Sequence, residues 1–146
     1  MTTESSPDTL NQHPYATTSA TQVESTITVL LVEDQTFVRD VICEVLQVDG
    51  YRVVKARNAR DARRKFGIHH DQIELLITDI VMPGGDGQDL AEALRKANPH
   101  LATLFISGYP QHASSRAVRE RLEFYLPKPF SAAALSQKVR HILAQR

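Results

Sequence analysis

Five short, almost continuous apolar runs punctuate this chain of 146 residues, and segments with helical spacing separate them. The runs consist largely of Val, Ile, Leu and aromatic residues, which is typical of strands that are buried on both faces. Strands that alternate with helices imply right-handed crossovers, and therefore a parallel sheet covered by helices on both sides. The predicted strands are 27–32, 52–56, 73–78, 103–106 and 123–126.

The segments between and after these runs predict five helices. Apolar residues recur at spacings of three and four from Phe37 to Leu46, a pattern that favours an amphipathic helix. Asn58 with Asp61 three residues later resembles an N-cap pair and opens the second helix. The helices are predicted over 37–50, 58–67, 86–98, 112–121, where the apolar pattern is weakest, and from 131 onward.

The first 26 residues differ in character from the rest of the chain. They are mostly Thr, Ser, Gln, Asn and Pro, and their few apolar residues show no period. Such a segment cannot bury enough apolar surface to offset the entropy of ordering. We therefore predict a disordered leader over 1–26 and one folded domain over 27–146.

Composition excludes several classes of protein. The single cysteine, Cys43, rules out an intramolecular disulfide and a multi-cysteine zinc site, and favours a reducing compartment. No apolar run approaches the roughly 18 to 20 residues of a membrane helix. Basic and acidic residues balance at 17 each, which does not indicate a nucleic-acid surface. The sequence predicts a cytoplasmic protein that binds neither membranes nor nucleic acid.

Chemically active side chains follow four of the five predicted strands. Glu33 and Asp34 come after the first, Asp79 after the third, Ser107 after the fourth and Lys128 after the fifth. The carboxyl ends of parallel strands form the ligand-binding edge of such a sheet. Two carboxylates about 5 Å apart repel by roughly 3 kcal/mol at an effective dielectric near 20, so the cluster favours a cation. Oxygen ligands favour Mg²⁺, and the ammonium and hydroxyl groups suit a phosphoryl group.

Four sequence motifs around these residues resemble one known family. The motifs LLVEDQ, LLITDIVMPGGDG, LFISGY and FYLPKPF occupy 30–35, 75–87, 104–109 and 124–130. In order and spacing they resemble the response-regulator receiver domain of two-component signalling, in its chemotaxis-regulator-like form. The resemblance implies a flavodoxin-like, doubly wound α/β fold with five parallel strands in the order 2-1-3-4-5 and five helices.

The resemblance also implies roles for individual residues. Asp79 matches the phosphoacceptor, which attacks the phosphohistidine of a histidine kinase or histidine phosphotransfer domain. Asp34 matches a direct Mg²⁺ ligand and Glu33 a ligand through water, while Asp79 and the backbone carbonyl of Val81 complete the metal ligands. Lys128 matches the lysine that stabilises the phosphoryl group, and the bond that follows it is often cis in this family.

Four positions concern the response to phosphorylation. Ser107, which also contacts the phosphoryl group, and Tyr125 match the two switch positions of the family, where the hydroxyl moves and the ring turns into the vacated space. Val81 and Tyr109 flank the approach of hydrolytic water. We expect them to shield the acyl phosphate and to tune the rate of dephosphorylation, unless they only pack at the surface.

The sequence favours a stand-alone receiver that acts as a switch rather than as an enzyme. Its output would pass to an unknown protein target, as a monomer or as a phosphorylation-dependent homodimer. A receiver-fold module that signals without phosphorylation, and a detached receiver of a hybrid histidine kinase, are the alternatives. A phosphatase of the haloacid dehalogenase type would need a second Asp where this chain has Val81.

Overall fold

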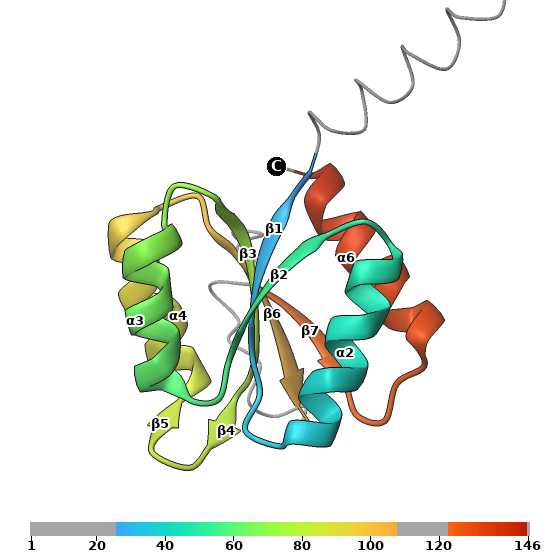
Figure 1. The fold of residues 1–146 in the computed structure, drawn as a ribbon, viewed down its shortest axis with the longest axis horizontal. Helices are drawn as coiled ribbons and strands as arrows, with labels where there is room; N and C mark the ends of the chain where they lie inside the picture. Colours follow the sequence, from blue (N-terminus) through green and yellow to red (C-terminus); the bar gives the residue numbers. More distant parts are fainter. Residues whose placement is uncertain (1–25, 108–122, 146) are drawn as a thin grey trace, which may run out of the picture.

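The computed structural model describes residues 26–107 and 123–145, and within them one parallel sheet forms the centre of the fold (Figure 1). Its strands stand in the order β2-β1-β3-β6-β7, with every neighbouring pair parallel. Ranked along the chain this is the order 2-1-3-4-5, so the prediction is confirmed. The strands are β1 (Thr28–Val32), β2 (Arg52–Ala56), β3 (Ile73–Asp79), β6 (Ala102–Ser107) and β7 (Glu123–Pro127).

The burial of the strands explains why the apolar runs are so continuous. All five residues of β1 are buried, and six of the seven residues of β3 are buried. These are central strands that receive helices on both faces, so both alternating sets of side chains must be apolar. The edge strand β2 is less buried and accordingly contains Arg52 and Lys55.

The part of the chain that the structure describes has four helices, α2 (Thr36–Val48), α3 (Ala59–His69), α4 (Gly87–Ala97) and α6 (Ala132–Ala144). The helices α3 and α4 pack on one face of the sheet around Phe66, Leu90 and Phe105, and α2 and α6 pack on the other around Leu46 and Val139 (Figure 1). The helix predicted over 112–121 lies outside the described residues. None of the described helices has the length and apolar character needed to cross a membrane.

The helix boundaries follow the capping residues of the sequence. The Asn58 side chain accepts a hydrogen bond from the Asp61 N–H at 2.8 Å, as the N-cap pattern predicted. Ser131 caps α6 in the same way, accepting from the Ala134 N–H at 3.0 Å. The helix α3 continues past the predicted end at Gly67 to His69, because glycine weakens a helix without necessarily ending it.

Two features differ from the sequence-based expectation. A small antiparallel hairpin, β4 (Val81–Met82) with β5 (Gly85–Asp86), lies between the third predicted strand and the helix that follows it, where no strand was predicted, and Gly84 has φ 81°. Strands of two residues are too short to give a periodic signal. In α2 only part of the apolar pattern faces the core, because Phe37 is 79% exposed and Val41 is 44% exposed.

Candidate functional site

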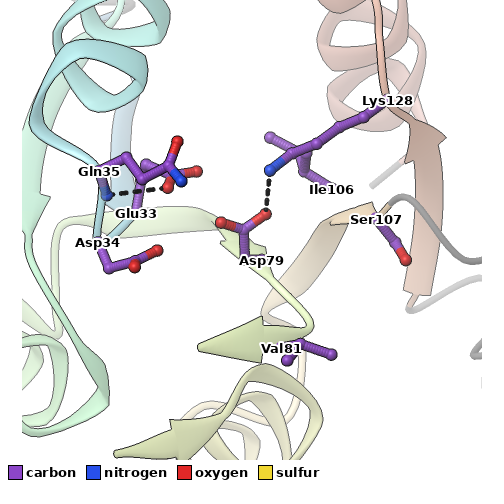
Figure 2. A pocket seen from close by; sticks show the side chains of 8 residues that line it. All are labelled: Glu33, Asp34, Gln35, Asp79, Val81, Ile106, Ser107 and Lys128. Atoms are coloured by element: carbon purple, nitrogen blue, oxygen red, sulfur yellow. Dashed lines mark hydrogen bonds and ion pairs between the residues drawn. The ribbon is translucent and has the colours of Figure 1, made fainter. Parts of the chain in front are cut away.

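The residues that follow the strands gather around one pocket of about 390 Å³. Its position at the carboxyl edge of the sheet is the one that the order of the strands predicts. Figure 2 shows Asp79 between the acidic pair on one side and Lys128 and Ser107 on the other. The pocket is lined by Glu33, Asp34, Gln35, Asp79, Val81, Ile106, Ser107 and Lys128.

Asp79 is the last residue of β3 and is 6% exposed. Its Oδ1 lies 3.0 Å from the Lys128 Nζ, a charge-assisted contact. The backbone on both sides of it is also fixed. The Thr78 hydroxyl donates to the Asp79 carbonyl at 2.9 Å, and the Gly87 N–H donates to the Ile80 carbonyl at 2.7 Å. The carboxylate therefore projects into the pocket from a well-supported strand end.

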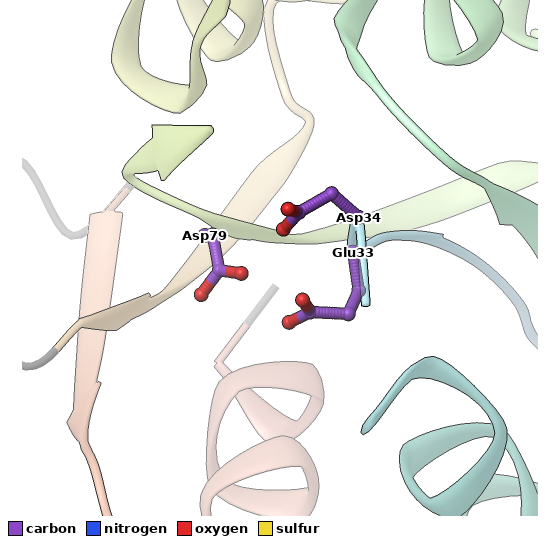
Figure 3. Close-up of side chains that lie close together, drawn as sticks. All are labelled: Glu33, Asp34 and Asp79. Carbon is purple, nitrogen blue, oxygen red and sulfur yellow. The ribbon is translucent and has the colours of Figure 1, made fainter. Parts of the chain in front are cut away.

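Three carboxylates meet on the other side of the pocket. Glu33, Asp34 and Asp79 each offer an oxygen, and these oxygens all lie within 4.8 Å of one another. Figure 3 shows the three side chains facing a common space. Glu33 and Asp79 are buried, whereas Asp34 is exposed.

This acidic cluster fits a divalent cation. Glu33 Oε2 accepts a hydrogen bond from the Gln35 N–H at 3.1 Å, but the buried Glu33 Oε1 has no hydrogen-bond partner among the described residues. A buried oxygen without a donor is unfavourable, and a hydrated cation would satisfy it. The donor set consists of oxygens, with room left for other ligands, and such a set suits Mg²⁺.

The protonation of Glu33 reflects this environment in the metal-free protein. Burial raises the pKa of Glu33 to about 8, together with the neighbouring Asp79 carboxylate, which repels the charged form and can accept a hydrogen bond from the protonated one. The Gln35 N–H and the Lys128 ammonium act in the opposite direction and offset part of this increase. Glu33 therefore keeps its proton to a higher pH than an ordinary glutamic acid does while the cation is absent.

The loop that carries the acidic pair is fixed by the start of α2. The Arg39 Nη1 donates to the Glu33 carbonyl oxygen at 2.7 Å. A second Arg39 nitrogen lies 3.4 Å from the Thr36 hydroxyl. The guanidinium thus holds the loop against the first turn of the helix.

Within its described residues, the structure brings together most of the side chains that the sequence singled out, and it places one of them, Tyr125, outside the pocket. Ser107 and Val81 line the pocket, and Val81 is 64% exposed. The Lys128–Pro129 bond is cis, as the resemblance implied. Tyr125 does not line the pocket but stacks on Phe105, with ring centroids 5.3 Å apart. Tyr109 lies outside the described residues.

Sequence reasoning missed two pocket residues, Gln35 and Ile106. Both sit next to a predicted site residue, one after Asp34 and one before Ser107. Their type carries no chemical signal, but their position at a strand end could have indicated them.

A second, apolar groove of about 350 Å³ adjoins the pocket. Gln35 and Lys128 line both cavities, so the groove is continuous with the site. The exposed Phe37 and Val41 belong to it. The groove lies between α2 and the segment that leads into α6, and its other lining residues are Val38, Ile42, Pro129 and Phe130.

The chain is similar to known proteins over most of its length. A family model described as the response regulator receiver domain matches residues 29–140. The sensor kinase CckA of Brucella abortus (strain 2308) is 35% identical over 128 residues, which is 87% of this chain. The same alignment spans only 14% of that kinase.

Solved structures agree with the sequence matches. The receiver domain of the hybrid histidine kinase CckA has a TM-score of 0.69 at 32% identity, covering 80% of this chain and 98% of that one. The response regulator TrrA from Thermotoga maritima, solved in complex with Mg²⁺ and BeF, has a TM-score of 0.70 at 29% identity. That match covers 80% of this chain and 99% of TrrA.

Proposed function

The chain belongs to the response regulator receiver domain family, and from this premise and the geometry of the pocket we propose that it is a phosphorylation switch. Asp79 accepts a phosphoryl group from the phosphohistidine of a histidine kinase or a histidine phosphotransfer domain. The modification changes a face that binds a downstream protein. The chain thus acts in a cytoplasmic relay and is not an enzyme for a separate substrate.

The pocket supplies the groups that such a transfer needs. An Asp79 carboxylate oxygen attacks the phosphorus, the phosphorus–nitrogen bond breaks, and the imidazole leaves with the bonding pair and takes up a proton from solvent. The Lys128 ammonium, 3.0 Å from Asp79 Oδ1, is placed to stabilise the charge of the phosphoryl oxygens, and Ser107 lines the same pocket, where its hydroxyl would donate a further hydrogen bond to them. Asp34, Asp79 and the Val81 carbonyl would hold Mg²⁺, with Glu33 acting through water, and the cation would supply charge neutralisation at the phosphoryl oxygens.

The observation that carries this proposal is the convergence of one buried carboxylate with a lysine and with two further acids in one pocket. The test is the intact mass of the protein after incubation with a small phosphodonor and Mg²⁺. We expect wild type to gain one phosphoryl group and Asp79→Asn to gain none. A gain of equal size in Asp79→Asn would refute the assignment.

Removal of the exposed carboxylate of Asp34 should abolish most of the stabilisation of the folded protein by Mg²⁺. A ligand at about 100 times its dissociation constant stabilises a folded protein by roughly 2.7 kcal/mol. We expect Asp34→Asn to lose most of the Mg²⁺-dependent rise in melting temperature, because it removes a direct ligand. Asp40→Asn is the matched control, since Asp40 is an exposed acid that pairs with Lys55 outside the cluster. An unchanged Mg²⁺ response in Asp34→Asn would show that the metal site is misplaced.

The apolar groove is the docking surface that we propose for the helix bearing the donor phosphohistidine. Its continuity with the pocket supports this, because a donor seated there would bring its imidazole beside Asp79. We expect Phe37→Asp to slow transfer from a protein donor about tenfold or more, as loss of an aromatic anchor does, while phosphorylation by a small donor is unchanged.

The control for this experiment lies on the same helix. Val48 is 81% exposed at the other end of α2 and does not line the groove. Val48→Asp should therefore leave both rates near wild type. If Phe37→Asp transfers at the wild-type rate from every protein donor tested, the groove is not the docking surface.

The similarity to CckA favours a second candidate function, in which the phosphoryl transfer is the same but this sequence is the receiver part of a hybrid kinase. Phosphorylation from a kinase domain encoded with it would support that reading. A receiver that signals without phosphorylation is the other alternative. Its affinity for the downstream partner would be the same in wild type and in Asp79→Asn. The oligomeric state, monomer or phosphorylation-dependent homodimer, stays a prediction.

A further inference from the structure

An ion pair between a largely buried arginine and a buried glutamate lies on the α4 side of the sheet, outside the phosphoryl pocket. The Arg95 Nη2, in the last turn of α4, is 2.7 Å from Glu123 Oε2 at the start of β7. The two side chains are 17% and 6% exposed. The phosphoryl chemistry proposed above uses neither residue.

The ion pair is linked to the sheet through residues that face each other on β6 and β7. Thr103 faces Glu123 and Phe105 faces Tyr125 in the register of β6 with β7. The Arg95 Nη1 donates to the Thr103 hydroxyl at 3.3 Å. The same guanidinium thus connects α4 to both strands.

The Glu123 carboxylate uses each of its oxygens for a different partner. While Oε2 receives Arg95, Oε1 accepts the hydroxyl proton of Tyr125 at 3.1 Å. Residues two apart on a strand share a face, so the phenol runs back along β7 and packs flat against Phe105. Tyr125 is thereby held inward, against the core that α3 and α4 cover.

A buried pair of arginine and glutamate contributes little to the free energy of folding. Desolvation of the two ions costs several kcal/mol each, and an apolar pair of similar volume is often as stable or more so. What an ion pair adds is direction, because its hydrogen bonds fix where each oxygen points. Here the direction fixed is that of the carboxylate that receives the Tyr125 hydroxyl.

We propose that Glu123 and Arg95 are positioning residues that hold the Tyr125 ring inward and tie its position to α4. The inference rests on the proposed function and on the family resemblance, which implies that the Tyr125 ring turns inward when Asp79 is phosphorylated. The anchor therefore biases the unphosphorylated protein toward the conformation that the phosphoryl group selects. A protein without the anchor populates that conformation less and binds a phosphoryl mimic more weakly by the same factor.

The position of the ring can be measured without any phosphoryl chemistry. Protein labelled with fluorotyrosine gives a ¹⁹F resonance for Tyr125, which the loss of one signal in Tyr125→Phe assigns. The double variant Arg95→Met with Glu123→Leu replaces both charges by apolar groups, which keeps the fold while removing the anchor. We expect its Tyr125 resonance to move toward the solvent-exposed value and to broaden.

Two further variants separate positioning from general disturbance. In Glu123→Gln the amide oxygen can still accept from Arg95 while the amide N–H donates to the phenol oxygen, so the Tyr125 resonance should stay near its wild-type position. Asp40→Asn removes an exposed ion pair on the other side of the sheet and should change nothing. An unchanged resonance in a folded double variant would overturn the proposal.

The second readout is the affinity for beryllofluoride with Mg²⁺. We expect the double variant to bind about 3- to 10-fold more weakly than wild type, the equivalent of one lost hydrogen bond. Equal affinity of wild type and a folded double variant for beryllofluoride would overturn the proposal that the anchor favours the phosphorylated conformation. Failure of wild type itself to bind beryllofluoride would refute the proposed function, while the ¹⁹F shift would still decide whether the anchor exists.

Discussion

Replacing Gly87 by alanine is expected to lower the free energy of unfolding by about 3 kcal/mol and to slow phosphorylation of Asp79. A Cβ at this position would overlap the Asp79 carbonyl oxygen and would lie 2.9 Å from the Asp79 carbonyl carbon and 3.1 Å from the Ile80 Cα. These are backbone atoms, so no flexible side chain can give way. Overpacking of this kind typically costs about 1 to 3 kcal/mol, and occasionally more.

Urea denaturation of Gly87→Ala measures the first effect, and the rate of phosphorylation by a small donor measures the second. Gly67→Ala is the matched control, since Gly67 lies in α3, where a Cβ would meet no atom within 4 Å, and the alanine should gain stability. A Gly87→Ala protein as stable as wild type would mean that α4 can move away from β3 freely. The account of how Asp79 is held in place would then be wrong.

The metal-free protein should lose stability as the pH rises from about 5 to 8. Because burial and the neighbouring Asp79 raise the pKa of Glu33 from 4.5 to about 8, the folded state binds this proton more tightly than the unfolded state over that interval. Stability is then full below the unfolded pKa and falls as pH rises, with a slope that approaches about 1.4 kcal/mol per pH unit for one group. Chemical denaturation in EDTA at several pH values measures the slope.

Glu33→Gln isolates this contribution, because the glutamine cannot ionise and its side-chain oxygen can still accept from the Gln35 N–H. The variant should show a flatter pH profile than wild type and should exceed it in stability most at pH 8. Parallel profiles for the two proteins would contradict the raised pKa of Glu33.

The strands and the pocket could be predicted from the sequence because their signals are local. Central parallel strands such as β1 and β3 need apolar residues on both faces, which gives short unbroken runs. Once the strands alternate with helices, topology places the residues after each strand at one edge. For that reason Asp34, Asp79 and Lys128 could be assigned to one pocket from their positions in the sequence.

The features that sequence reasoning missed depend on contacts between distant segments. The pairing of Arg95 with Glu123 joins residues 28 positions apart, and nothing in either neighbourhood indicates the partner. The exposure of Phe37 was missed for a related reason. A helical apolar pattern does not say how wide the buried stripe is, and here part of it lines the groove beside the pocket.

Identification of the phosphorylated residue tests directly whether Asp79 is the phosphoacceptor. The protein is phosphorylated with a small donor and Mg²⁺, the acyl phosphate is reduced with borohydride to the corresponding alcohol, and the peptides are analysed by mass spectrometry. We expect homoserine at position 79 alone, and no homoserine at any position when Mg²⁺ is withheld. Reduction at Glu33 or Asp34 instead, or a stable phosphate on Ser107, would contradict this assignment.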